Sequence, residues 1–142
     1  PVKVHFLVAG VTHNAEQRFK KKLKRQIRFQ ECRPEKCHAL VVFCPVSSRI
    51  GTDIDAALQN IPGDKPAALV VMHHTYDPEA VVAESSRLVT RRDTVAVDCL
   101  FHETVGLLRN CPTNKQAVRR VSKALKPKKS GKKNQRKGKV DP

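Results

Sequence analysis

Residues 39–44 read Ala-Leu-Val-Val-Phe-Cys, six consecutive apolar side chains rich in β-branched and aromatic types. A strand with one face in water alternates apolar and polar residues, whereas a strand covered on both faces is apolar throughout. This stretch therefore predicts a strand in the interior of a parallel sheet. Three other stretches share the pattern, so we predict four strands, at residues 2–9, 39–44, 67–73 and 94–100.

The segments between these strands have the apolar spacing of amphipathic helices. Each begins with a pair of polar residues three positions apart, as in a helix capping box: Asn14 with Gln17, Thr52 with Asp55, and Thr113 with Gln116. We expect the first helix to run to about residue 30. We expect the last to end before Pro127 and to bury Ala117, Val118, Val121, Ala124 and Leu125. Residues 77–92 fit either a short helix or a loop.

Strands that alternate with helices in this order predict an α/β fold. We expect a single three-layer domain at residues 1–126, with a mostly parallel four-stranded sheet and a flavodoxin-like or TIR-like organisation. Residues 127–142 are polar and basic, with Val140 as the one large apolar side chain. Such a segment cannot bury enough surface to order itself, so we predict a disordered basic C-terminal tail.

The charge of the chain is strongly positive, with 28 Lys and Arg against 13 Asp and Glu and a formal net charge of +15. The basic residues concentrate at 18–28 and 126–139, and neither stretch contains an acid. Outside these two segments, basic and acidic residues are equal in number. The sequence therefore assigns the net charge to two short segments and not to the fold as a whole.

Acid-free basic segments are typical of proteins that bind polyanions. We therefore predict a non-catalytic nucleic-acid-binding protein that uses two groups of side chains. The first group lies on the first helix: Arg18, Lys20, Lys21, Lys22, Lys24, Arg25 and Arg28. The second lies in the tail: Lys128, Lys129, Lys132, Lys133, Arg136 and Lys137. With one Tyr, five Phe and no Trp, we expect phosphate contacts to dominate and no aromatic platform for the bases.

An enzymatic alternative rests on the carboxyl ends of the predicted strands, where open α/β sheets bind their ligands. His74, His102, Glu103 and Arg49 follow these strands and are the candidate catalytic residues. No complete motif supports them. The run from Cys44 to Arg49 has four intervening residues where the phosphatase loop has five, and no glycine-rich phosphate loop is present. We predict no metal and no cofactor. A helix start near Thr52, with Arg49 beside it, could still hold an anion.

A third alternative is an adaptor whose basic face meets acidic proteins or anionic lipids. The chain has no apolar run long enough for a transmembrane helix, and it opens on a predicted strand without the features of a signal peptide. Its five cysteines are an odd number for a disulfide framework. We therefore expect residence in the cytoplasm, the nucleus or both.

Three segments carry a resemblance to known sequences: residues 41–53, residues 71–75 and residues 97–103. They resemble a group of small, poorly characterised fish proteins, and the likeness covers roughly residues 1–125. The resemblance implies no activity, cofactor or site residue. It suggests a lineage-restricted protein of the kind often tied to host defence.

Overall fold

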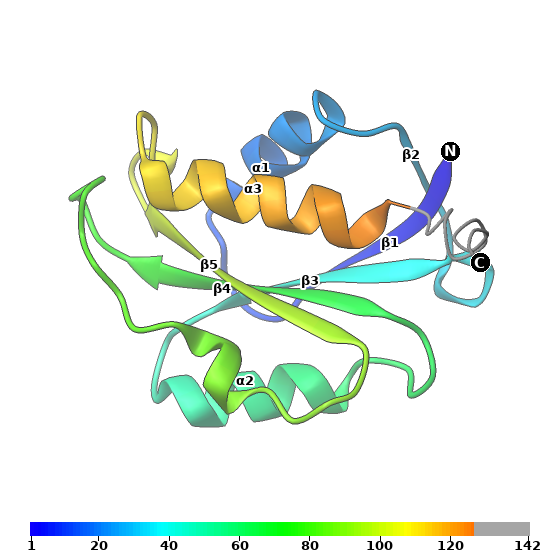
Figure 1. Ribbon diagram of the computed structural model, residues 1–142. Helices are drawn as coiled ribbons and strands as arrows, with labels where there is room; N and C mark the ends of the chain where they lie inside the picture. Colours follow the sequence, from blue (N-terminus) through cyan, green and yellow to red (C-terminus); the bar gives the residue numbers. More distant parts are fainter. Residues whose placement is uncertain (127–142) are drawn as a thin grey trace, which may run out of the picture.

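The four strands expected from the sequence are present in the computed structural model, which describes residues 1–126. They belong to a curled six-stranded sheet in the order β2-β1-β3-β4-β5-β6 (Figure 1). Its strands are β1 (Val2–Val8), β2 (Phe29–Glu31), β3 (Ala39–Pro45), β4 (Ala67–His74), β5 (Thr94–His102) and β6 (Gly106–Leu107). The first five strands are parallel, and β6 runs antiparallel to β5.

The prediction of four strands was wrong because both edges of the sheet carry a short additional strand. β2 has three residues and β6 has two. Edge strands are often this short, and they need no apolar side chains on both faces. Two of the three residues of β2 are exposed, so they lack the continuous hydrophobicity by which the inner strands were found.

The helices are α1 (Ala15–Lys24), α2 (Ile50–Gln59) and α3 (Pro112–Leu125). None of the three predicted capping boxes forms, since no side chain caps the start of any of these helices. Asn14 has a left-handed backbone with φ 65°. α3 begins on Pro112, which has no N–H to satisfy. α1 ends well before residue 30, because the chain must turn there to enter β2.

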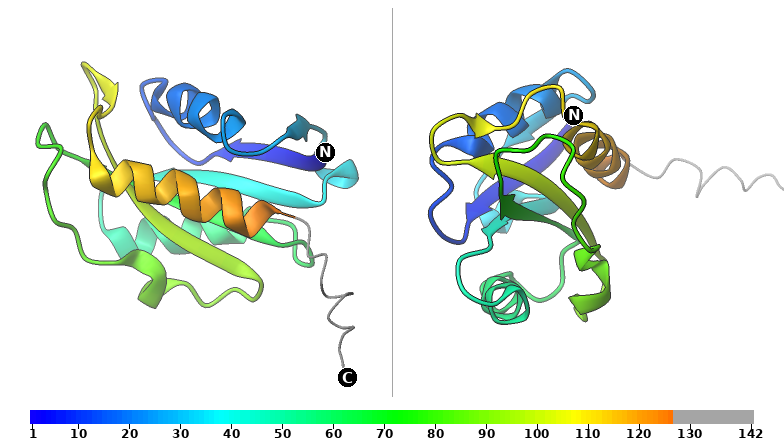
Figure 2. Two further views of the ribbon diagram at one scale, coloured as in Figure 1. Left: turned by 45° about the horizontal axis from the view of Figure 1, so that its top comes forward. Right: turned by 90° about the vertical axis from the view of Figure 1, so that its left-hand side faces the viewer.

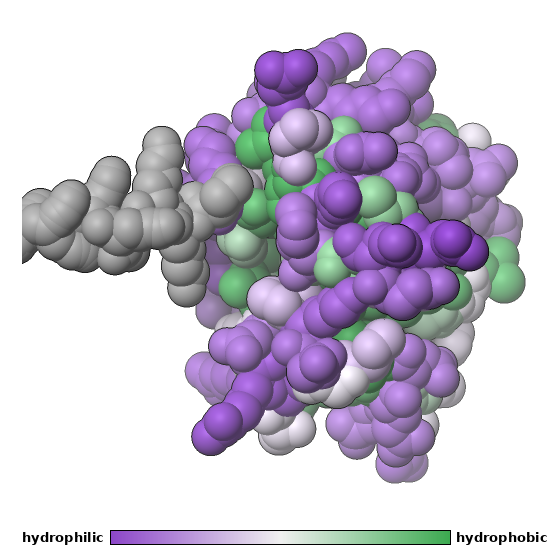
Figure 3. All heavy atoms as spheres, turned by 90° about the vertical axis from the view of Figure 1, so that its right-hand side faces the viewer, coloured by the Kyte–Doolittle hydropathy of each residue, from purple (hydrophilic) through white to green (hydrophobic). Residues whose placement is uncertain are grey.

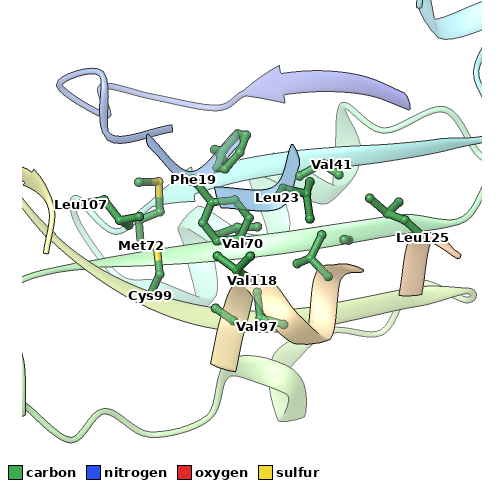
Figure 4. Packing of buried hydrophobic residues seen from close by; sticks show 14 of the residues in the cluster. Phe19, Leu23, Val41, Val70, Met72, Val97, Cys99, Leu107, Val118 and Leu125 are labelled. Atoms are coloured by element: carbon green, nitrogen blue, oxygen red, sulfur yellow. The ribbon is translucent and has the colours of Figure 1, made fainter. Parts of the chain in front are cut away.

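The helices cover both faces of the sheet and give three layers. α1 and α3 lie side by side on one face, and α2 lies on the other (Figures 1 and 2). Phe19 and Leu23 of α1 and Val118 of α3 pack on alternate strand residues such as Val41 and Val70 (Figure 4). Ile54 and Ala57 of α2 pack on the intervening strand residues, which include Leu40, Val42, Leu69 and Val71. The inner strands are thus apolar on both faces, as predicted.

The stripe predicted for α3 is confirmed at four of its five positions. Ala117, Val118, Val121 and Leu125 are buried, whereas Ala124 is exposed. Ala124 was wrongly included because it lies at the margin of the apolar stripe, on the side of the helix that turns away from the sheet. Asn114 and Ser122 are the buried polar residues of this helix.

Residues 77–92 form a loop with one short 3-10 helix, η2 (Ser85–Leu88); another, η1 (Pro34–Lys36), joins β2 to β3. Asp98 of β5 holds this loop, since it accepts the N–H of Ser85 at 3.0 Å and the Ser85 hydroxyl at 2.5 Å. His73 of β4 lies 2.8 Å from the same carboxylate. Burial alone would raise the pKa of Asp98, but these hydrogen bonds lower it.

α3 ends at Leu125, close to the predicted boundary at residue 126. The predicted disordered tail, residues 127–142, lies outside the residues that the structure describes. Within residues 1–126, no helix has the length and apolar character that crossing a bilayer requires.

Candidate functional site

Two of the basic side chains that the sequence assigned to the first helix stabilise the fold. Nη1 of Arg18 donates to the carbonyl oxygen of Leu107 at 2.6 Å, which ties α1 to β6. Nζ of Lys20 lies 3.5 Å from a carboxylate oxygen of Glu31 and 4.5 Å from the centre of the Phe6 ring. These contacts position α1 on the sheet and use part of both positive charges.

The other five basic side chains of this group are available to a partner. Lys21, Lys24, Arg25 and Arg28 are exposed and Lys22 is half-buried. Lys24 also lies 6.0 Å from the centre of the Phe29 ring, at the limit of a cation–π contact. Within residues 1–126, the pair of Lys20 with Glu31 is the one ion pair that any Lys or Arg forms. The basic residues of α1 therefore have almost no compensation from the chain itself.

α3 adds a second row of basic side chains that the sequence analysis did not assign to the site. Lys115, Arg119, Arg120 and Lys123 are exposed on it, and the helix contains no acid. α1 and α3 are in contact on the same face of the sheet (Figure 2). We call the exposed basic residues of α1, of the turn after it and of α3 the basic layer.

The signal for the second row was present in the sequence. Residues 104–126 contain six Lys and Arg and no Asp or Glu. The pattern was missed because apolar residues separate these bases, so they form no dense run. Helical spacing nevertheless brings Lys115, Arg119 and Lys123 to one side of α3, since each is four residues from the next.

The helix on the opposite face of the sheet, α2, has the other sign of charge. α2 contains Asp53 and Asp55 and no Lys or Arg. Helices α1 and α3 together contain one acid, Glu16. Within residues 1–126, the positive charge therefore gathers on one layer of the fold, where α3 joins the first basic stretch of the sequence.

The carboxyl edge of the sheet does not join the four candidate catalytic residues into one site. The His74 ring packs on Phe101 with 4.4 Å between ring centres. The His102 ring stacks on Tyr76 at 3.5 Å, and its Nδ1 accepts the N–H of Thr104 at 3.2 Å. Within residues 1–126, no hydrogen bond or ion pair connects any two of His74, His102, Glu103 and Arg49.

Beside the start of α2, considered above as an anion site, the chain places a carboxylate of its own. One carboxylate oxygen of Asp53 accepts the N–H of Ser47 at 2.8 Å and that of Ser48 at 3.0 Å, and the other accepts the Ser48 hydroxyl at 3.0 Å. The two backbone N–H bonds are the main reason that the pKa of Asp53 is lowered. This carboxylate would repel a phosphate at the start of α2, although Arg49 beside it is exposed.

Metal binding and thiol reactivity both depend on the surroundings of the cysteines and histidines. No three metal-ligating side chains gather in the part of the chain that the structure describes. His73 and His74 lie on opposite faces of the sheet, with Asp98 and with Phe101 respectively. Burial raises the pKa of the Cys44 thiol to about 11 and raises that of Cys99 as well, so both thiols stay protonated at neutral pH.

A hollow of about 980 Å³ lies where α1 and α3 end, beside the start of β1. Its lining combines apolar side chains such as Val2, Ile27 and Leu125 with the basic side chains of Arg28, Lys123 and Lys126. Figure 3 shows this side of the molecule, with apolar surface (green) among hydrophilic groups (purple). Lys126, which lines this hollow, is the last residue that the structure describes.

The predicted tail residues of the site, Lys128, Lys129, Lys132, Lys133, Arg136 and Lys137, lie outside the described residues. Comparisons of the chain with protein-family models, with curated proteins and with solved structures found no match.

Proposed function

We propose that the protein is a non-catalytic nucleic-acid-binding protein and that its phosphate contacts come from the basic layer. The observation that carries the proposal is the gathering, on one face of the fold, of Lys and Arg side chains that form no ion pair within residues 1–126. An ordinary solvated helix mixes both signs and gains from pairs four residues apart, whereas α3 has no acid at all. Such a surface is stable only at the expense of repulsion between its own charges, which a polyanion relieves.

The geometry of the layer supports a long anion over a small one. The free basic side chains are distributed along two adjacent helices, and of these Arg28 and Lys123 line the hollow where the helices end. Contacts with phosphates along a nucleic-acid backbone need such a spread, because each Lys or Arg side chain neutralises a different phosphate. The tail would add to this footprint in the same sense, since residues 127–139 are rich in Lys and contain no acid.

The order of the five parallel strands favours a flavodoxin-like organisation, although β6 adds an antiparallel edge. In such sheets a ligand binds where the strand order reverses, here between β1 and β3. At that point, residues of the chain itself occupy the space where a ligand would lie. A side chain at Gly10 would begin 2.8 Å from the Pro45 ring, and Asp53 occupies the amides that follow β3. We therefore place the function on the basic layer and not at this edge.

The test compares two charge-matched double variants of the full chain in fluorescence anisotropy with labelled RNA and duplex DNA. Arg119→Gln with Lys123→Gln removes two charges from the basic layer, and Arg49→Gln with Arg87→Gln removes two exposed charges from the other side of the sheet. Because net charge falls equally in both, only a localised footprint separates them. We expect the first variant to bind several-fold more weakly than the second, and equal affinities would contradict the proposal.

The adaptor alternative uses the same layer and is separated by the ligand. Sedimentation with vesicles of neutral lipid, with and without a third of anionic lipid, measures attraction to a membrane surface. Vesicle binding that is tighter than RNA binding at the same salt concentration would move the assignment from nucleic acid to anionic lipid.

A further inference from the structure

Tyr76 is the single tyrosine of the chain, and its ring is held in place while most of it faces solvent. It follows β4 and is 69% exposed. One face stacks on the His102 ring, with 3.5 Å between ring centres and 24° between their planes. His102 is itself fixed at its Nδ1 by the N–H of Thr104. An aromatic ring that is both exposed and supported from behind is suited to receive a second planar group.

The hollow beside Tyr76 has the size and the charge for a nucleotide. It has a volume of about 250 Å³ and is lined by Arg18, Tyr76, Pro78, Val105, Leu107, Leu108 and Arg109. Val105 is 52% exposed, so a second apolar side chain faces solvent in the same place. The lining contains two guanidinium groups and no carboxylate. Apolar walls with two Arg side chains suit a nucleobase whose backbone has a phosphate on either side.

The hollow also adjoins the basic layer. Arg18 belongs to α1 and is anchored to the carbonyl oxygen of Leu107 at 2.6 Å, so its charge is fixed at the wall. Arg109 is exposed and lies just before α3. A nucleic-acid strand that runs along either helix toward the carboxyl edge of the β-sheet would therefore reach Tyr76.

We propose that this hollow binds one unpaired base of a single-stranded nucleic acid, which stacks on the free face of Tyr76 while Arg18 and Arg109 contact the flanking phosphates. The inference rests on the function proposed above and adds a preference for single strands, because a base within a duplex is not free to stack. It also departs from the sequence analysis, which expected no aromatic platform. Composition shows that aromatic residues are few but not that one of them is exposed on a second ring.

The chain carries its own probe for this contact. It has one Tyr and no Trp, so the intrinsic emission of the protein comes from Tyr76. The full chain is titrated with three ligands: an oligouridylate of about 12 nucleotides, a duplex RNA of similar charge, and a heparin fragment, which has charges but no bases. Free N-acetyltyrosinamide with the same ligands corrects for absorbed light. We expect oligouridylate to quench Tyr76 emission over the same concentrations at which fluorescence anisotropy shows binding. Duplex RNA and heparin should bind without quenching this emission.

Substitution separates stacking from charge. Tyr76→Ala is expected to weaken oligouridylate binding by roughly 5- to 100-fold, as the loss of one stacked base does, and to leave heparin binding unchanged. Tyr76→Phe keeps the ring and should retain most of the affinity. Val81→Ala, at a position 96% exposed outside the hollow, is the matched control for a lost apolar surface. Circular dichroism checks that each variant is folded.

The outcomes distinguish this inference from the function on which it rests. Oligouridylate binding without a change in Tyr76 emission, or with unchanged affinity in folded Tyr76→Ala, overturns the stacking site and leaves the basic layer as the binding surface. Absence of binding to all three ligands overturns both.

Discussion

Replacing Asn114 by Ala should destabilise the protein because this side chain connects α3 to the edge of the sheet. Asn114 is 2% exposed. Its Oδ1 accepts the N–H of Leu100 at 2.7 Å, and its Nδ2 donates to the carbonyl oxygens of Leu100 at 2.9 Å and Leu108 at 3.1 Å. It thus does for the edge of β5 what a neighbouring strand would do, at the point where β6 departs.

The magnitude follows from the groups that lose a partner. The oxygen of Leu100 keeps the N–H of Leu108 at 3.1 Å, so two buried groups, the N–H of Leu100 and the oxygen of Leu108, are left without Asn114. Each unsatisfied buried group costs about 1–3 kcal/mol, which gives a loss of about 2–6 kcal/mol in the free energy of unfolding. Typical domains have about 5–15 kcal/mol in total, so the loss is a large fraction.

Urea unfolding followed by far-ultraviolet circular dichroism measures this loss, and the exposed neighbour Lys115→Ala serves as the control in the same helix. Lys115→Ala should change the free energy of unfolding by less than about 0.5 kcal/mol. A loss below about 1 kcal/mol in Asn114→Ala would refute the reasoning, since it would mean that water or a shifted backbone satisfies both groups.

Three further predictions concern stability and reactivity. The folded-state pKa of Asp98 is lowered, so the stability that this carboxylate contributes is present above the unfolded pKa near 4 and is lost as the pH falls below that value. The urea midpoint should therefore fall less steeply with acidification in Asp98→Asn than in the unmodified protein. Parallel curves for the two proteins would argue against the role of Asp98. Gly10→Ala places a side chain at φ +144° and 2.8 Å from the Pro45 ring, so we expect the free energy of unfolding to fall by at least about 1 kcal/mol. Gly51→Ala, in α2 and with open space around it, should cause no loss. In the folded protein at pH 8, an aromatic disulfide reagent should modify half-buried Cys32 well before Cys44, whose pKa is about 11, and equal rates by mass spectrometry would contradict the burial of Cys44.

The inner part of the fold was predictable from the sequence because burial on both faces leaves a clear pattern. The apolar runs of β1, β3, β4 and β5 were recognised, with ends that differ by at most two residues. The edges were not recognised, since β2 and β6 are too short to show any period. The capping residues were misjudged because two helices begin earlier than predicted, α2 at Ile50 before Thr52 and α3 at Pro112 before Thr113.

The site was predictable only in part, for the same physical reason. A dense run such as Lys20-Lys21-Lys22 is visible in one dimension. The row on α3 becomes a surface only when α3 packs beside α1, and the stack of Tyr76 on His102 joins residues from two strand ends. Sequence reasoning also could not show that Arg18 and Lys20 are partly used in the fold, because their partners Leu107 and Glu31 lie elsewhere in the chain.

The most direct test of the account is the salt dependence of duplex binding by the full chain, with and without four charges of the basic layer. The variant carries Lys21→Gln, Arg25→Gln, Arg119→Gln and Lys123→Gln, all at exposed positions. If about six phosphates are contacted, log affinity should fall with log salt at a slope of roughly −5, and the variant should be shallower by roughly 3 to 4. A flat response, or the same steep slope in both proteins, would contradict the claim that the basic layer binds the backbone.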